Sequence, residues 1–434
     1  MRLDRLEIRN FKKFSDYTLD LHPQFTLLVG DNGTGKTTLL DALAIAAGVW
    51  LVNSPDTTLA NSKRNIRTSE IHLDSIEAKG ITQFIERKPV EIKALGWIGN
   101  QEIQWLRQIK EHGSRTSNVE AKLALDMISD LYRRDQAGEK LWFPVLAYYG
   151  AGRAWLPSNQ TDPKATSGKD IARRWHAFYD CFEERIRIAD LQTWFQKEAL
   201  AALQRQGNMR LGFQVVKFAI LRCIPGADDL WFDGDRSEIV VSIDHYPIPF
   251  SNLSAGQKMM VALLADIAIK VVTQNANFLP NSVDLNAKDP PQILQETTGL
   301  ILIDEIDVHL HPKWQRQVVH DLRTTFPAMQ FVCTTHSPMV IGEVEPECIR
   351  SLQPQGARTP TNALGLDANR VLDELMGASE RNKDVTQMLH KLFQFIDHEN
   401  FDQAREAIDA LKQQIGLDPE ITRAQSLIAF LEDV

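Results

Sequence analysis

The sequence predicts an α/β fold in which buried parallel strands carry polar residues at their carboxyl ends. Three apolar runs are each followed by distinctive residues: 25–29 by Gly30–Thr38, 299–303 by Asp304 and Glu305, and 329–335 by His336. Apolar runs without alternation are typical of strands buried on both faces, and a helix is predicted over 39–47, after the first run. Because such sheets bind ligands where their strands end, we expect these residues to share one site.

The composition is that of a soluble globular protein. The 434 residues are 43% hydrophobic and 24% charged, enough for one large domain with insertions or for two domains. No apolar run approaches the roughly 20 residues that cross a bilayer, and the first residues resemble a strand rather than a signal peptide, so we expect no membrane association. The four cysteines form no CxxC pair, which predicts reduced, mostly buried thiols and a cytoplasmic protein.

The negative charge is unevenly distributed. The formal net charge of −9 argues against a wholly basic nucleic-acid-binding surface. Residues 365–434 alone contain 14 Asp and Glu against 7 Lys and Arg. This acidic stretch is either a solvated helical surface or a docking surface for a partner, and the sequence leaves both interpretations open.

The stretch Gly30–Thr38 has the pattern of a phosphate-binding loop. Its glycines let backbone N–H groups curl around phosphate oxygens, and the helix that follows directs its positive dipole end toward the same anion. Lys36 is predicted to neutralise the β- and γ-phosphates, and the Thr37 hydroxyl to ligate Mg²⁺. The residues of the loop expected to contact ATP are Asn32, Gly33, Thr34, Gly35, Lys36, Thr37 and Thr38.

The carboxylates after the 299–303 run fit the hydrolysis of a nucleoside triphosphate. Asp304, at the end of the strand, is expected to hold Mg²⁺ through water, so that Thr37 and Asp304 form the metal site. Glu305 is expected to act as the general base that polarises the attacking water. Of these two adjacent acids, Asp304 would hold the metal ion and Glu305 would activate the water.

A second glycine-containing motif precedes an apolar helix predicted over 259–272. Ser254 is expected to cap this helix, while its hydroxyl, the small Gly256 and the exposed N–H groups can approach a γ-phosphate closely. The residues from Leu253 to Gln257 read LSAGQ, which resembles the LSGGQ signature of ABC-type ATPases with alanine at one glycine position.

The order of these motifs resembles the ATPase heads of the RecF/SMC/Rad50 class, motif by motif over residues 1–50 and 245–350 and loosely between them. The resemblance implies that Ser254, Gly256 and Gln257 contact the ATP of a second protomer, so that the chain forms at least a homodimer with two nucleotides between the heads. It implies that His336 senses the γ-phosphate. The stretch Asn10–Phe14, ahead of the phosphate loop, also resembles this class. The resemblance implies that Lys12 and Lys13 lie near the nucleotide.

Two segments resemble a narrower group. Ile303–Pro312 and Leu146–Arg153 are similar to the single-chain ATPases of Septu-type anti-phage systems, which also occur beside some retrons. This resemblance implies a separate HNH-type nuclease controlled by nucleotide. Related ATPases place a glutamine after the strand predicted over 145–149, and none is present here. Tyr149 or Arg153 could reach the phosphates instead, or this stretch could be a tight turn.

We expect four regions: an N-terminal lobe of the ATPase head (1–110), a helical insertion that includes the strand 145–149 (111–228), a C-terminal lobe with the signature, Asp304, Glu305 and His336 (229–360), and an acidic helical tail that docks a partner or another protomer (361–434). Helical patterns are expected over 168–202 and 313–323, and three helices are expected in the tail, over 385–396, over 401–415 and from Pro419 to Leu431. The resulting hypothesis is a regulatory ATPase of an anti-phage complex. Two alternatives remain: a RecF-like repair ATPase that clamps DNA, and an ATP-bound scaffold with little hydrolysis. Contact with DNA could be direct or through the partner.

Overall fold

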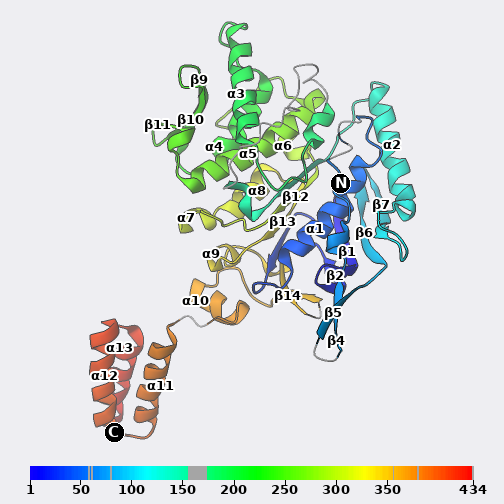
Figure 1. Ribbon diagram of the computed structural model, residues 1–434. Coiled ribbons are helices and arrows are strands. Elements are labelled where there is room, and N and C mark those ends of the chain that lie inside the picture. The colour runs from blue at the N-terminus through cyan, green and yellow to red at the C-terminus, as the bar shows by residue number, and fades with distance from the viewer. Residues whose placement is uncertain are drawn as a thin grey trace. The chain divides into compact units, whose positions relative to one another are not determined.

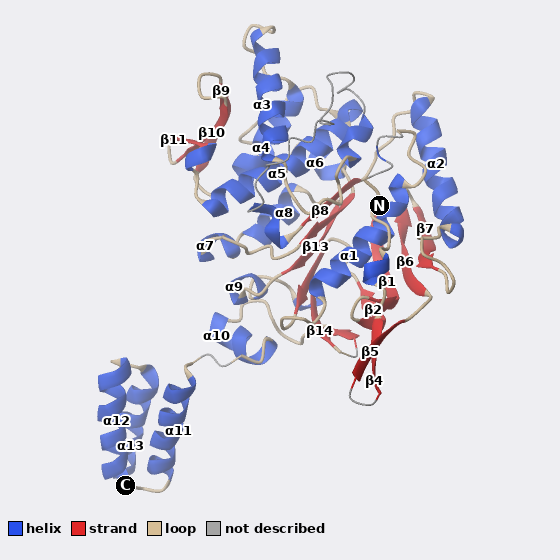
Figure 2. Cartoon of the chain, in the orientation of Figure 1, coloured by secondary structure: helices blue, strands red, loops and turns tan. Residues whose placement is uncertain are grey.

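The computed structural model describes residues 1–56, 59, 62–78, 81–154, 174–354, 356–378 and 381–432, except for a few side chains within these ranges. The chain forms two compact units, Met1–Leu366 and Asp367–Val434. Figure 1 shows the course of the chain and Figure 2 the distribution of helices and strands. Among the described residues, no helix has both the length and the apolar character needed to span a membrane.

The first unit is built on a six-stranded sheet of order β15-β14-β3-β13-β12-β8. Four neighbouring strands in it are parallel and buried along their whole length: β3 (Phe25–Val29), β13 (Met329–Thr334), β12 (Gly299–Ile303) and β8 (Val145–Tyr149). The predicted parallel sheet is therefore confirmed. In register, Ile303 of β12 pairs with Tyr149 on one side and Cys333 on the other, so the segments after these strands emerge at one edge.

The other end of the sheet was not predicted. β14 (Ile349–Gln353) runs parallel to β3, and β15 (Gly356–Arg358) is antiparallel to β14. Both strands are only partly buried and carry polar residues, such as Arg350 and Ser351 of β14, so they lack the apolar run that marks the central strands.

A second, antiparallel sheet has the order β2-β1-β6-β7. Its strands are β1 (Arg2–Phe11), β2 (Phe14–Asp20), β6 (Val90–Ile98) and β7 (Gln101–Ile109). Helix α1 (Lys36–Ala47) contacts both this sheet and the strands β12 and β13, and it is buried along almost all of its length (Figure 1). The phosphate loop is thus anchored between two sheets, which explains the apolar sequence of the helix that follows it.

Helices cover the rest of the first unit, and smaller sheets project from it. The helices are α2 (Lys122–Gln136), α3 (Ile188–Leu203), α4 (Leu211–Cys223), α5 (Ala255–Gln274), α6 (Gln292–Glu296), α7 (Pro312–Gln315), α8 (Val318–Thr325) and α9 (Pro338–Ile341). The smaller sheets are the hairpin of β4 (Leu73–Ala78) and β5 (Ile81–Glu86), and the three strands β9 (Ala227–Asp233), β10 (Glu238–Ile243) and β11 (Tyr246–Pro249).

Two helix predictions need correction. The expected helix over 313–323 is divided into α7 and α8 by a turn at residues 316 and 317. Helix α7 has no buried residue, whereas α8 buries a face that begins at Val318. The helical pattern expected over 168–202 lies partly outside the described residues. In the described part, helix α3 begins only at Ile188, and residues 179–187 instead run beside strand β8.

The second unit contains a small three-helix bundle made of α11 (Lys383–Asp397), α12 (Phe401–Ile415) and α13 (Pro419–Glu432). It has a core of its own, formed by Leu389, Leu392, Ile396, Ala404, Ile408, Leu411, Ile421, Ala424 and Ile428. The three helices predicted for the acidic tail are therefore confirmed. A short helix, α10 (Ala368–Arg370), precedes them.

Candidate functional site

The phosphate loop adopts a backbone that requires glycine. Gly33 and Gly35 have φ values of 78° and 103°, in the left-handed region that side chains rarely adopt. A Cβ on Gly35 would also overlap the ring of Phe14, which follows the turn after β1. The loop is thus held in a compact shape by its own conformation and by the antiparallel sheet behind it.

Lys36, the first residue of α1, is folded into this loop. Its Nζ donates hydrogen bonds to the carbonyl oxygens of Gly30 (2.7 Å) and Asp31 (3.1 Å), and the residue is 8% exposed. Burial lowers the pKa of Lys36, against the raising effect of Asp304 and Asp31. An ammonium group that has lost most of its water gains from an anionic ligand, so its position suits a phosphate.

The two predicted metal ligands are brought together. Thr37 Oγ1, on α1, donates a hydrogen bond of 2.8 Å to Asp304 Oδ2, which follows β12. The other carboxylate oxygen accepts a bond of 2.6 Å from Thr334 Oγ1, at the end of β13. The backbone N–H of Asp304 donates to the carbonyl of Tyr149 at 2.8 Å, which ties the end of β12 to the end of β8. Three strands and one helix therefore fix this carboxylate.

Glu305 and His336 emerge from the same edge. The Glu305 N–H donates to Thr334 Oγ1 at 2.7 Å, and its φ of 49° turns the chain sharply after the strand. A positive φ at a non-glycine residue is uncommon and often marks a functional position. His336 is half-buried two residues after β13.

The signature motif has the predicted local structure. Ser254 caps α5 in a reciprocal arrangement: its Oγ accepts from the Gln257 N–H (3.3 Å), and Gln257 Oε1 accepts from the Ser254 N–H (2.9 Å). A Cβ on Gly256 would overlap the carbonyl oxygen of His309, so this glycine packs directly on the loop after β12. Among the described residues, no hydrogen bond or ion pair joins these signature residues to the phosphate loop of the same chain.

The two predicted basic residues ahead of the loop have different environments. Lys13 is exposed and its ammonium group donates to the carbonyl oxygen of Gly33. Lys12 instead forms ion pairs with Asp41 of α1 and with Glu70, 3.5 Å away. Lys13 therefore lies on the phosphate loop, whereas Lys12 lies in a network behind it.

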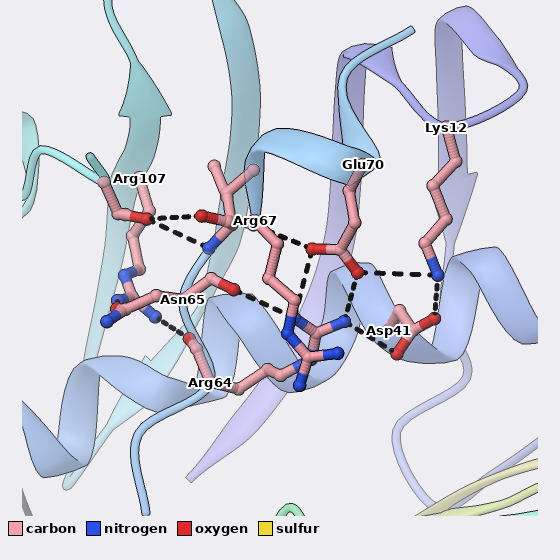
Figure 3. A network of polar contacts seen from close by, with 9 residues as sticks. Lys12, Asp41, Arg64, Asn65, Arg67, Glu70 and Arg107 are labelled. Atoms are coloured by element: carbon pink, nitrogen blue, oxygen red, sulfur yellow. Dashed lines mark hydrogen bonds and ion pairs between the residues drawn. The ribbon is translucent and has the colours of Figure 1, made fainter. Parts of the chain in front are cut away.

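That network was not predicted (Figure 3). At its centre the buried Arg64 guanidinium bonds the carboxylates of Asp41 (3.1 Å) and Glu70 (3.1 Å to Oε2). Arg107, from β7, donates to the carbonyl oxygens of Ile45 (2.6 Å) and Arg64 (2.8 Å). A charged residue at position 41, within an otherwise apolar helical run, was the sequence signal that could have revealed it.

Tyr149 and Arg153 are the two residues that could replace the missing glutamine. The hydroxyl of Tyr149 donates to Asp266 Oδ2 on α5, at 2.6 Å. The side chain of Arg153 lies outside what the structure describes. His311 accepts a hydrogen bond from the Lys313 N–H at the start of α7 (3.3 Å). Within the described residues, no group of three or more His, Cys, Asp or Glu side chains is placed to hold a metal ion by itself.

The donors present fit ATP with Mg²⁺. The loop offers backbone N–H groups and a buried ammonium group, and the hydroxyl of Thr37 beside the carboxylate of Asp304 offers hard oxygen ligands. Magnesium in such sites relies on one or two protein ligands together with phosphate oxygens and water, so a larger protein cluster is not required. When bound, the ion would neutralise charge on the phosphates.

Known proteins are similar to this chain. A family model described as an AAA domain matches residues 5–208, and one described as "AAA domain, putative AbiEii toxin, Type IV TA system" matches residues 225–342. The chain is 32% identical over 488 residues to the Retron Ec83 probable ATPase of Escherichia coli, covering 97% of this chain and 85% of that protein. The Septu protein PtuA of Bacillus thuringiensis is 24% identical over 353 residues, covering 78% of this chain and 72% of that one.

Among solved structures, the SMC head domain from Thermotoga maritima is similar with a TM-score of 0.46 and 14% identity, covering 83% of this chain and 100% of that one. The sequence relatives determine the family. With 32% identity over nearly the whole chain to a retron ATPase, and with the phosphate loop and strand-end carboxylates in place, this protein belongs to the ABC-type ATPases of the RecF/SMC class found in bacterial anti-phage systems.

Proposed function

We propose that this chain binds and hydrolyses ATP between two protomers and uses the ATP-bound dimer to control a partner nuclease of the HNH type. The observation that carries the ATP site is the bond of 2.8 Å between Thr37 and Asp304, because it joins the phosphate loop to the strand-end carboxylates. In this proposal Thr37 and Asp304 hold Mg²⁺, and Lys36 neutralises the phosphates. Glu305 activates water, and His336 senses the γ-phosphate.

The dimer is supported by the position of the signature. Ser254, Gly256 and Gln257 form the N-terminus of α5, where Ser254 and Gln257 make a capping box. Within the described residues, no hydrogen bond or ion pair connects them to the phosphate loop of their own chain. Gly256 packs against the loop that follows Glu305, so we expect a phosphate bound by the signature to affect the position of this general base. We propose that this phosphate belongs to the ATP of the second protomer.

The C-terminal bundle supports a docking role. Helix α13 exposes a line of apolar side chains at helical spacing, Leu427, Phe430 and Leu431, which are 37%, 66% and 41% exposed. The region around it is acidic, with 14 Asp and Glu against 7 Lys and Arg in residues 365–434. We propose that this apolar line, in a unit that is acidic as a whole, binds a partner with a basic rim.

The proposal is tested by purifying the tagged chain from its native host with and without ATP and Mg²⁺, and identifying its partners by mass spectrometry. The expected result is an HNH-type nuclease that co-purifies with the chain and whose cleavage of DNA changes when Glu305→Gln prevents hydrolysis. Recombination proteins together with DNA, and no nuclease, would contradict the proposal and favour a repair ATPase that clamps DNA. Tight ATP binding with no measurable turnover in the intact complex would favour the scaffold.

A further inference from the structure

The free edge of strand β8 is covered by a segment from a distant part of the sequence. β8 is the last strand in the sheet order, so its outer edge has backbone groups without a strand partner. The N–H of Tyr148 donates to the carbonyl of Cys181 (2.8 Å), and that of Gly150 donates to the carbonyl of Glu184 (2.9 Å). Glu184 is thereby held beside the end of this strand.

The end of β8 is next to the carboxylate of Asp304. Tyr149 pairs with Ile303 in the parallel register, and the carbonyl of Tyr149 accepts the Asp304 N–H at 2.8 Å. The next residue along the strand direction is Gly150. A segment held beside Gly150 is therefore one strand away from the residue that we assign to the metal.

The side chain of Glu184 lies directly over Gly150. A Cβ placed on Gly150 would be 2.7 Å from Glu184 Cβ and 2.8 Å from Glu184 Oε2. The φ of Gly150 is not in the left-handed region, so space rather than backbone conformation explains the glycine. Glycine at this position leaves room for a carboxylate at the strand end.

Glu184 is exposed to solvent, and charges of both signs act on its carboxylate. Partial burial and the negative charges of Asp41 and Asp304 raise its pKa, and the positive charges of Arg64 and Lys12 oppose them with a smaller effect. In the described ranges, its oxygens have no hydrogen-bond or ion-pair partner. Like-charged carboxylates near one site disfavour each other, and a bound cation reverses this effect.

We propose that Glu184 contacts the Mg²⁺ of bound ATP through a metal-bound water, together with Thr37 and Asp304. This residue would occupy the place beside β8 for which Tyr149 and Arg153 were the candidates from the sequence. The inference rests on the proposed ATP site. The backbone of Glu184 already completes the edge of β8, so its carboxylate is not needed for that structural role, and the two roles can be separated by mutation.

The test is the Mg²⁺ dependence of nucleotide binding, measured by the fluorescence of a mant-ATP probe at increasing Mg²⁺ for the full chain. Loss of an outer ligand typically weakens metal binding by about 10- to 100-fold, so we expect Glu184→Gln to raise the Mg²⁺ concentration for half-maximal binding by about tenfold. Binding of mant-ATP in EDTA should be unchanged. With Mn²⁺ in place of Mg²⁺, the electron paramagnetic resonance spectrum of the bound ion should also change.

Two further variants make the result decisive. Glu183→Gln is the matched control, because Glu183 is exposed and its charge acts on Asp180; it should behave like the wild-type chain. Asp304→Asn should raise the Mg²⁺ requirement if the ATP site is correct. A shift with Asp304→Asn but none with Glu184→Gln would overturn the role of Glu184 alone. No shift with either variant would overturn the proposed ATP site as well.

Discussion

At the scale of single residues, Asp304 and Glu305 are neighbours with different environments, and we propose different tasks for them. Asp304 is held by Thr37 and Thr334, whereas the Glu305 backbone turns away from the strand with a positive φ. We predict that Glu305→Gln lowers ATP turnover by about 10²- to 10⁴-fold, the usual contribution of a general base, and leaves ATP binding intact. Phosphate release and gel filtration with ATP would show slow turnover and a persistent dimer. Unchanged turnover would mean that another group activates the water.

Gly256 offers a second test at this scale, because a Cβ would overlap the carbonyl oxygen of His309. We predict that Gly256→Ala displaces the signature from the loop after β12 and lowers turnover by about 10²-fold, as small misplacements in active sites do. Binding of mant-ATP to the monomer should not change. Gly234→Ala is the control, because a Cβ there meets nothing within 4 Å. Equal turnover of the two variants would show that this packing is unimportant.

The residues proposed for the site came from the sequence more directly than the residues that support them. Each motif residue has a chemical reason to be where it is, so Lys36, Thr37, Asp304 and Ser254 were proposed from residue type and spacing. Glu184 was not, because its position depends on pairing between β8 and a segment more than 30 residues away. Such pairing leaves no local pattern.

At the scale of elements, the network around Arg64 joins α1 to the segment that precedes β4. We predict that Arg64→Ala lowers the free energy of unfolding by about 3 kcal/mol, because it leaves Asp41 and Glu70 buried without their main partner. Denaturant unfolding of the full chain would measure this loss. Arg67→Ala is the matched control, because Arg67 is exposed and contributes its backbone N–H to Glu70. A loss as large with Arg67→Ala would contradict the assignment to this network.

The same network predicts a pH dependence. Burial opposes ionisation of Glu70, but hydrogen bonds from Arg64 and Arg67 outweigh it, so the pKa of Glu70 lies below its ordinary value of 4.5. A lowered folded-state pKa stabilises the fold above pH 4.5, and this contribution is lost as the pH falls through the folded-state pKa. The stability difference between the wild-type chain and Arg64→Ala should therefore shrink on acidification. A constant difference down to pH 3 would contradict this account.

The elements that the sequence predicted well are those with an uninterrupted apolar run or with apolar residues at helical spacing. Strands β3, β8, β12 and β13 and the helices of the C-terminal bundle all have this property. The strands β14 and β15 and the hairpin β4–β5 do not, since they mix polar residues into the run or expose their apolar ones, such as Phe84 at 67% exposure. Their pairing comes from tertiary neighbours, which a local pattern does not record.

At the scale of the whole molecule, the two compact units correspond to the two proposed roles, ATP hydrolysis and the docking of a partner. The ATP-site residues all lie in Met1–Leu366, and the exposed line on α13 lies in the other unit. We predict that Leu427→Ser with Phe430→Ser weakens association with the proposed nuclease partner by at least about tenfold, since a few buried apolar anchors carry most of the energy of an interface. ATP turnover of the isolated chain should stay within about twofold, because such surface changes rarely disturb a distant site.

The matched control is Leu203→Ser, because Leu203 is 74% exposed at the end of α3 and lies in the unit that holds the ATP site. Pull-downs of the nuclease by each full-length variant, with circular dichroism to check folding, would separate a docking surface from a general effect of removing exposed leucines. If Leu203→Ser weakens association and the α13 variant does not, the nuclease binds the ATPase unit itself. The acidic bundle would then be a solvated surface, as one interpretation of its charge allows.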